Sequence, residues 1–111
     1  MKSLPIVLVV AVVSNADAAS APSMTVSWAS MTLSDEDCTA LGEKTMRATG
    51  LTKNFEIVGT TVYGETGDYT AAIRCVSSKE IVFFVTAGPK SDRTEEINKN
   101  NKALFIEPKS N

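Results

Sequence analysis

The sequence predicts an α+β domain in which a mainly antiparallel sheet of three or four strands packs against one or two helices, with one disulfide. Three observations favour this class. A capped helical pattern lies between Ser34 and Gly50, residues 55–87 divide into alternating or wholly apolar segments separated by short turns, and Cys38 and Cys75 are the two cysteines of the chain. Short connections between neighbouring strands are typical of an antiparallel meander.

The first 18 residues have the pattern of a secretory signal peptide. Lys2 gives a positive start, residues 4–13 form an apolar run, and Ala16-Asp17-Ala18 offers small residues to signal peptidase. A membrane-spanning helix needs about 20 apolar residues, so this run is too short for an anchor. We therefore expect export to the periplasm or the medium, with no stable membrane insertion after cleavage. The expected mature chain has a flexible leader at residues 19–23, one domain over residues 24–107 and a frayed tail at residues 108–111.

The composition excludes several classes of function. The chain carries 11 Lys+Arg against 13 Asp+Glu, so it has no basic field to attract nucleic acid. Histidine is absent, which removes Ser-His-Asp and Cys-His catalysis and any metal site that uses imidazole. The sequence therefore predicts no metal, no cofactor and no nucleic-acid partner.

Cys38 and Cys75 are expected to form a disulfide, because an exported chain meets an oxidising compartment. Closing a loop of about 37 residues would stabilise a small domain by about 4 kcal/mol. A redox-active pair is disfavoured, since the chain has no Cys-x-x-Cys spacing.

The first strand and the first helix follow from periodicity and caps. Met24, Val26 and Trp28 alternate with small or polar residues, which predicts a strand within residues 24–33. Ser34 is the expected N-cap of the helix, and Gly50 is its expected left-handed C-cap. The elements after this helix are less clearly marked in the sequence. The apolar stripe of the helix consists of Cys38, Leu41, Gly42, Thr45 and Ala48, with Met46 at its flank.

Three strands and a second helix are expected to follow. Residues 55–63 form one strand, with a bulge at Gly59 where the parity of the apolar residues changes. After a turn at residues 64–67, residues 69–75 and 81–87 form the next two strands. A second helix is expected to run from Ser91 or Asp92 to about Leu104, although its apolar content is thin.

The expected disulfide is hard to place in this topology. A first helix antiparallel to the strand that follows it would put Cys38 near residues 63–69 and Cys75 at the far end of the sheet. A disulfide requires α-carbons within about 7 Å. We keep the cysteine pairing and leave the relative placement of helix and sheet open.

The strand at residues 81–87 raises the question of what covers its two faces. Its apolar residues run from Ile81 to Val85 without a polar break, so one alternating set meets the first helix and the other needs separate cover. The second helix or the strand of Trp28 is one expected cover. A binding surface for a protein, a ligand or a second copy is the other, because a sizeable exposed apolar patch is usually functional. The candidate binding face consists of Trp28, Arg74, Val82 and Phe84.

Two polar clusters are weaker candidates for a site. Lys90, Ser91 and Arg93 lie where a helix start attracts anions, but neighbouring acidic residues oppose an anion there. Glu65 and Asp68 could hold calcium, yet ordinary turn chemistry explains them better.

The order of these motifs resembles that of small exported bacterial proteins of uncharacterised function. Those proteins carry a Cys-containing helix that ends in Gly and a strand pair close to GxYxAxIxC and VxFxVAGP. The matching residues here are Cys38, Gly50, Gly67, Tyr69, Ala71, Ile73, Cys75, Val82, Phe84, Ala87, Gly88 and Pro89. The resemblance covers most of the mature chain, implies a Gram-negative periplasm and transfers no catalytic residue.

The sequence thus favours a noncatalytic periplasmic or secreted module that binds a protein or a small ligand, a class that includes small exported enzyme inhibitors. Two alternatives stay open. A small carboxylate-dependent hydrolase would need a deep pocket that joins Arg74, Glu56 or Tyr69 with a carboxylate whose pKa is strongly perturbed. A self-associating structural protein, or a homodimer, would use the second sheet face.

Overall fold

The computed structural model describes residues 21–107, so the expected signal peptide, the first residues of the leader and the tail at 108–111 lie outside the described residues. The elements in chain order are β1 (Ser23–Ser30), α2 (Asp35–Ala48), β2 (Lys53–Val58), β3 (Thr61–Thr66), β4 (Tyr69–Val76), η1 (Ser77–Lys79), β5 (Ile81–Gly88) and α3 (Ser91–Ile106). Within residues 21–107, no helix is long and apolar enough to cross a membrane.

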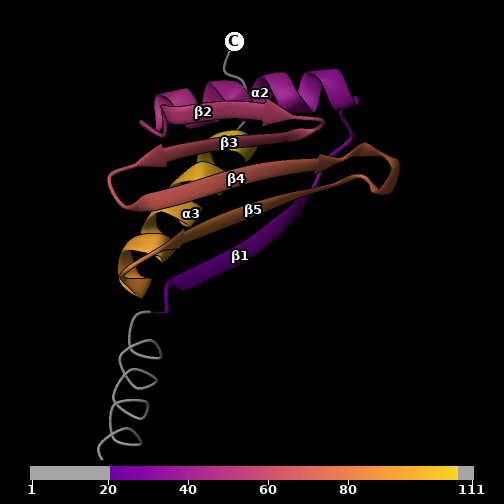
Figure 1. Ribbon diagram of the computed structural model, residues 1–111. Coiled ribbons are helices and arrows are strands. Elements are labelled where there is room, and N and C mark those ends of the chain that lie inside the picture. Colours follow the sequence, from indigo (N-terminus) through magenta and orange to yellow (C-terminus); the bar gives the residue numbers. More distant parts are fainter. Residues whose placement is uncertain (1–20, 108–111) are drawn as a thin grey trace, which may run out of the picture.

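The five strands form one antiparallel sheet in the order β1-β5-β4-β3-β2 (Figure 1). The α+β class, the antiparallel sheet and the disulfide are confirmed. The predicted count of three or four strands is too low, because residues 55–63 do not form a single bulged strand.

The extra strand comes from a chain reversal at Gly59-Thr60. Val58 pairs with Thr61, so two residues connect β2 to β3. Gly59 has a φ of 60°, as tight hairpins require at the first residue of the turn. The change of parity that the sequence shows at Gly59 is therefore a hairpin and not a bulge. The next turn is likewise two residues long, at Gly67-Asp68, and residues 64–66 belong to β3.

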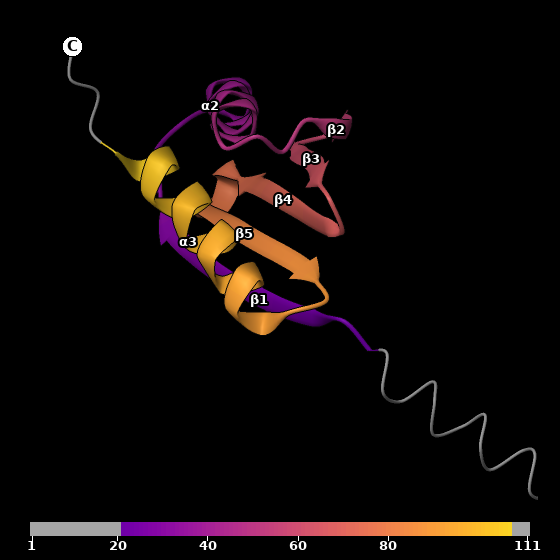
Figure 2. The same ribbon diagram turned by 90° about the vertical axis from the view of Figure 1, so that its left-hand side faces the viewer.

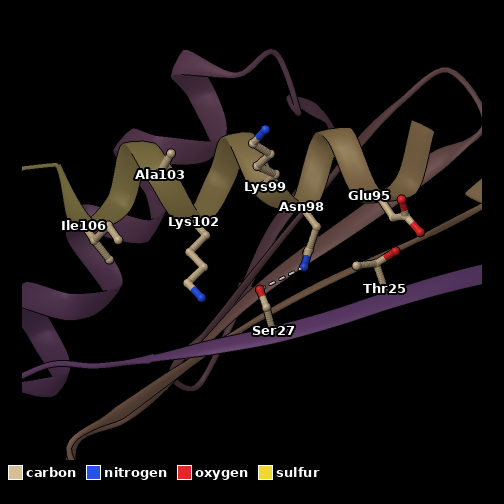
Figure 3. Close-up of a pocket in the computed structure, with 8 residues that line it drawn as sticks. All are labelled: Thr25, Ser27, Glu95, Asn98, Lys99, Lys102, Ala103 and Ile106. Carbon is tan, nitrogen blue, oxygen red and sulfur yellow. Dashed lines mark hydrogen bonds between the residues drawn. The ribbon is translucent and has the colours of Figure 1, made fainter. Parts of the chain in front are cut away.

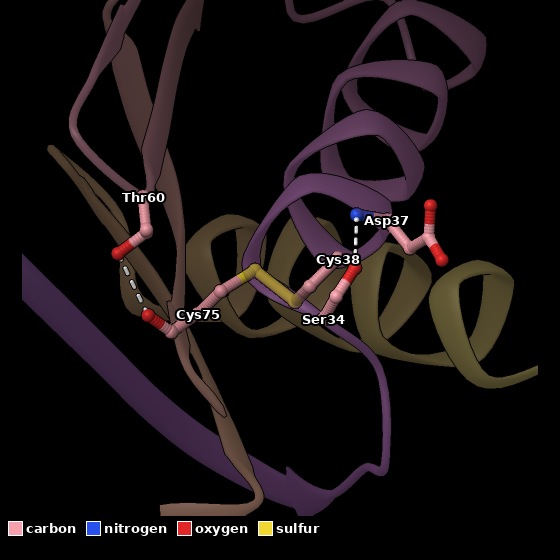
Figure 4. Close-up of a disulfide and its surroundings, with 5 residues drawn as sticks. All are labelled: Ser34, Asp37, Cys38, Thr60 and Cys75. Atoms are coloured by element: carbon pink, nitrogen blue, oxygen red, sulfur yellow. Dashed lines mark hydrogen bonds between the residues drawn. A yellow bond between two sulfur atoms is a disulfide. The ribbon is translucent and has the colours of Figure 1, made fainter. Parts of the chain in front are cut away.

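This hairpin explains how the disulfide forms. The reversal brings the turn at Thr60 beside the end of β4, where the Cys75 N–H donates to the Thr60 carbonyl at 2.9 Å. The Thr60 hydroxyl donates in turn to the Cys75 carbonyl at 2.8 Å. The first turn of α2 lies over the same end of the sheet, so the α-carbons of Cys38 and Cys75 are 6.1 Å apart (Figure 4).

Helix α2 begins and ends at the residues that the caps predict. Ser34 Oγ accepts a hydrogen bond from the Asp37 N–H at 3.1 Å. At the other end Leu51 N–H donates to Met46 and Gly50 N–H donates to Arg47, the two bonds of a Schellman motif. Met46 is fully buried, whereas Ala48, which the predicted stripe included, is exposed.

Both helices lie on the same face of the sheet (Figure 2). The core between helices and sheet consists mainly of Met31, Cys38, Met46, Leu51, Val62, Ala71, Ile73, Cys75, Val82, Phe84, Ile97 and Phe105. Phe84 and Phe105 meet edge to face, with their ring centroids 5.5 Å apart.

Helix α3 docks on the sheet partly through polar side chains. Asn98 is 2% exposed, accepts a bond from Thr86 Oγ1 at 2.9 Å and donates to Ser27 Oγ at 3.0 Å. Thr94 bonds to Thr25 at 3.0 Å. The apolar content of this segment is thin because buried hydroxyl and amide pairs hold much of the helix to β1 and β5.

Candidate functional site: the open face of the sheet

The sheet face opposite the helices carries large apolar side chains that residues 21–107 leave uncovered. On β1, Met24 is 66% exposed, Val26 is 57% exposed and Trp28 is 55% exposed. Neighbouring strand β5 adds half-buried apolar residues to the same face. We define the open sheet face as Met24, Val26, Trp28, Tyr63, Ala72, Arg74, Ile81, Phe83 and Val85.

The strand register arranges these residues in rows across the sheet. Trp28 lies opposite Phe83, and Phe83 lies opposite Arg74. The adjacent row runs from Val26 through Val85 and Ala72 to Tyr63. Because directly opposed side chains lie about 5 Å apart, each row is a continuous surface. The result is an apolar band over β1 and β5 that ends in a guanidinium on β4.

Arg74 is the charged group of the central row. The side chain is exposed, and no carboxylate of residues 21–107 lies within salt-bridge distance of it. The two ion pairs of the described chain, Arg47–Glu43 and Arg93–Glu96, lie on the helices. Arg74 is therefore available to an acidic group brought by a binding partner.

The four residues of the predicted binding face do not share one face of the sheet. Trp28 and Arg74 lie on the open sheet face, but Val82 and Phe84 are fully buried under the helices. The register explains the error, since Cys75 lies opposite Val82 and must point to the helix side to reach Cys38. Alternation then places Phe84 on the helix side as well.

Phe83 and Val85 are the residues that the sequence prediction missed. The predicted disulfide could have identified them. It requires the Cys75 side chain to point to the helix side, and the four-residue connection to β5 then decides which residues of β5 share that side. The expectation that α3 or β1 covers the second face is also wrong for the described residues. Strand β1 joins the sheet beside β5, and α3 packs beside α2 on the already covered face.

At the predicted anion site, the chain's own carboxylates bind Arg93. Arg93 donates from its guanidinium to Glu96 at 2.9 Å, and its N–H donates to the Asp92 carboxylate at 2.8 Å. Lys90 stands at the N-cap position, so neither Ser91 nor Asp92 is the cap. Arg93, one of the three residues of the predicted anion site, thus already has carboxylate partners within the chain.

Of the three residues considered for a hydrolase, Tyr69 is separated from Arg74, whereas Glu56 lies opposite Tyr63 on the side of the open sheet face. Arg74 points to the open sheet face, whereas Tyr69 lies on the helix side, where its ring covers Gly88. Glu65, the candidate calcium ligand, accepts a bond from Asn54 at 2.9 Å. Between residues 21 and 107, no three His, Cys, Asp or Glu side chains are grouped to hold a metal ion.

A groove of about 380 Å³ runs between β1 and α3 (Figure 3). Thr25 and Ser27 form its floor, and α3 overhangs it with a row of side chains at helical spacing. These are Glu95, Asn98, Lys99, Lys102, Ala103 and Ile106. The groove opens at the free edge of β1 and does not include Trp28 or Arg74.

No protein-family model matches the chain, and no curated protein is significantly similar to it. The resemblance to small exported bacterial proteins therefore stays a prediction.

Proposed function

We propose that the protein is a noncatalytic, exported binding module whose open sheet face docks a partner protein. The observation that carries this proposal is the exposure of Trp28 and Val26 beside Phe83 on a sheet face that residues 21–107 leave bare. Removing apolar surface from water is favourable by about 25 cal/mol per Å². A partner that covers these side chains therefore forms a more stable complex.

The size of the open sheet face suits a protein partner better than a small ligand. Strands lie about 4.8 Å apart and rise about 3.3 Å per residue, so the four strands β1, β5, β4 and β3, of six to eight residues each, cover roughly 500 Å² in projection. That is the range of the largest patches on monomeric proteins, which are often functional. Small molecules instead favour concave pockets that enclose most of their surface.

The partner should bring an acidic group within an apolar surface. Arg74 adjoins Phe83 and has no carboxylate of its own within reach in the described chain. Bidentate pairing of a guanidinium with a carboxylate adds direction to an otherwise apolar contact. Trp28 is the expected hot spot, because aromatic anchors dominate most protein interfaces.

Export to the periplasm or the medium is part of the proposal. The disulfide supports it, because disulfides persist in oxidising compartments and are rare in reducing ones. The sequence pattern of residues 1–18 supports it independently.

The experiment is capture of partners from an envelope extract of the source organism with the immobilised oxidised protein, followed by titration of the purified partner. Trp28→Lys should raise the dissociation constant at least about 30-fold, as hot-spot substitutions do. Arg74→Glu should raise the dissociation constant by about tenfold or more. It should also make the affinity less dependent on salt concentration.

Leu104→Lys is the matched control. Leu104 is an apolar residue that is 37% exposed, but it lies on α3, away from the open sheet face. The control should bind like the wild type. A partner that binds Trp28→Lys and Arg74→Glu with unchanged affinity would show that the open sheet face is not the binding surface.

A further inference from the structure

β1 is an edge strand without the usual protection against pairing with another chain. It has eight residues, SMTVSWAS, with no charged residue and no proline, and it pairs with β5 without a bulge. The opposite edge strand, β2, has six residues, carries Lys53 and Glu56, and is irregular between them. Natural proteins blunt edges with charges, short strands and bulges. Only the β2 edge has these features.

The outer backbone groups of β1 can be assigned from one hydrogen bond. The Met31 N–H donates to the Glu80 carbonyl at 3.0 Å, in continuation of the β1–β5 register. Bonded and non-bonded pairs alternate along an antiparallel ladder. The odd-numbered residues of β1 therefore bond to β5, and the even-numbered residues direct their N–H and C=O groups to the free edge. These are Met24, Val26, Trp28 and Ser30.

Helix α3 runs alongside this edge in a fixed register. Thr94 bonds to Thr25 and Asn98 bonds to Ser27, so the helix advances in the same direction as β1. Glu95, Lys99 and Lys102 all line the groove, and in Figure 3 the end of the Lys99 side chain is turned away from β1 whereas the Lys102 side chain extends toward it. Opposite charges thus lie on either side of the Asn98–Ser27 contact.

We propose that β1 pairs antiparallel with β1 of a second copy, about a two-fold axis at Ser27. In this register Val26 lies opposite Trp28 of the second copy, and Met24 lies opposite Ser30. All these residues direct their backbone groups to the free edge, so each such pair can exchange two hydrogen bonds. The two sheets then become one continuous sheet of ten strands.

The charges on α3 select the same axis independently. A two-fold axis at Ser27 passes between Asn98 and Lys99, which brings Glu95 of each copy opposite Lys102 of the other. Moving the axis to Val26 or Trp28 would keep the backbone pairing but would separate these charges. Self-complementarity of this kind is what an isologous two-fold interface requires.

The two helices also fit side by side. α3 packs on both β1 and β5, so its axis lies above the space between them. With strands about 4.8 Å apart, the two α3 axes would be roughly 10 Å apart, within the ordinary range of helix packing. The groove beside β1 is then filled by the second copy.

The edge interface is independent of the proposed docking on the open sheet face. The dimer is held by the backbone of β1 and by charged side chains of α3. Docking instead uses the side chains of Trp28, Phe83 and Arg74 on the open sheet face. Dimerisation joins the two open faces into one band, with Trp28 beside Val26 of the second copy.

Sedimentation equilibrium of the oxidised protein, expressed from the full sequence, tests the proposal with a charge exchange. The wild type should be a dimer, and Glu95→Lys or Lys102→Glu alone should weaken the dimer by about tenfold, because two attractive contacts become repulsive. An equimolar mixture of the two single variants should regain wild-type affinity as a heterodimer, and so should the double variant E95K/K102E.

Two further variants test the strand pairing. Val26→Pro removes an N–H that faces the free edge, a change that edge strands tolerate, so the protein should stay folded and become monomeric. Ser27→Cys places two thiols directly opposite each other across the axis, where α-carbons of a non-bonded pair are about 4.5 Å apart, and should give a disulfide-linked dimer. Thr25→Cys, which faces Ala29 of the second copy, should not.

A wild-type protein that stays monomeric at its highest soluble concentration would overturn the proposal. So would a dimer that is unaffected by Glu95→Lys, Lys102→Glu and Val26→Pro and is lost in Phe83→Lys, since that dimer would form through the open sheet face.

Discussion

Gly64 on β3 is a residue whose replacement should reveal how closely the chain after α2 approaches the sheet. A Cβ on Gly64 would overlap the backbone carbonyl oxygen of Leu51, which cannot move without displacing the end of α2. Gly64→Ala should therefore lower the free energy of unfolding by about 3 kcal/mol, measured by urea denaturation of the oxidised protein.

Gly59→Ala provides the comparison. A Cβ there meets open space, and the cost is limited to a left-handed backbone with φ of 60°, about 1 kcal/mol. Equal losses in the two variants would contradict the close approach of Leu51 to β3.

Asn98 should be the most important polar residue of α3 for stability. Asn98→Ala removes its bonds to Thr86 and Ser27 and leaves the fully buried Thr86 hydroxyl without a partner. The free energy of unfolding should fall by about 2 to 3 kcal/mol. Asn100→Ala on the exposed side of the same helix should change it by less than about 0.5 kcal/mol. A similar small effect at Asn98 would contradict the bonding of α3 described above.

These buried amides could not be predicted from residue type. Asn98 and Asn101 have low helix propensity, and apolar residues are few in this segment, so the second helix is only weakly marked in the sequence. Their contribution comes from partners distant in the chain, since Asn101 accepts a bond from Thr49 at 2.8 Å. Tertiary hydrogen bonds of this kind leave no periodic signal.

At the scale of elements, the disulfide joins the first turn of α2 to the end of β4. The double substitution C38A/C75A frees a loop with a sequence separation of 37 residues, and the free energy of unfolding should fall by about 4 kcal/mol. Reduction of the wild type should produce a comparable loss in the same urea titration. A loss below about 1 kcal/mol in both would contradict a stabilising role for this link.

The second prediction for an element concerns which residues of β5 face the helices and which lie on the open sheet face. Phe84→Lys should unfold the domain, because Phe84 is fully buried against Phe105. Phe83→Lys, one position earlier in the same strand, should lower the free energy of unfolding by about 1 kcal/mol or less, because Phe83 lies on the open face. Circular dichroism and urea denaturation would distinguish them. Reversed outcomes would mean that the strand faces are exchanged.

The helix α2 could be predicted from local sequence, and the topology could not. Ser34, Gly50 and most of the stripe around Gly42 are local signals with the predicted role in the structure, whereas Ala48 of that stripe is exposed. The sequence of the Gly59-Thr60 hairpin predicts a bulge equally well, because a bulge and a tight turn both place glycine where the alternation of apolar and polar residues shifts by one. That single misreading removed one strand and made the disulfide appear geometrically difficult.

At the scale of the whole molecule, the described chain is two layers, with helices on one side of a sheet and no covering layer on the other (Figure 2). The sequence showed that β5 is apolar on both faces, but it could not show that β1 joins the edge of the sheet instead of covering it. Long-range strand pairing decides this, and an eight-residue strand such as β1 fits either arrangement. Trp28 and Arg74 were identified because each stands out by residue type, whereas Phe83 needed the register.

Trp28 is the one tryptophan of the chain, so its fluorescence reports directly on the open sheet face. The most direct test is acrylamide quenching of the folded, oxidised protein, compared with the urea-unfolded chain. The structure predicts red-shifted emission and quenching at a large fraction of the unfolded rate, with protection when a partner protein binds. Blue-shifted emission that acrylamide does not reach in the isolated protein would contradict a sheet with one bare apolar face.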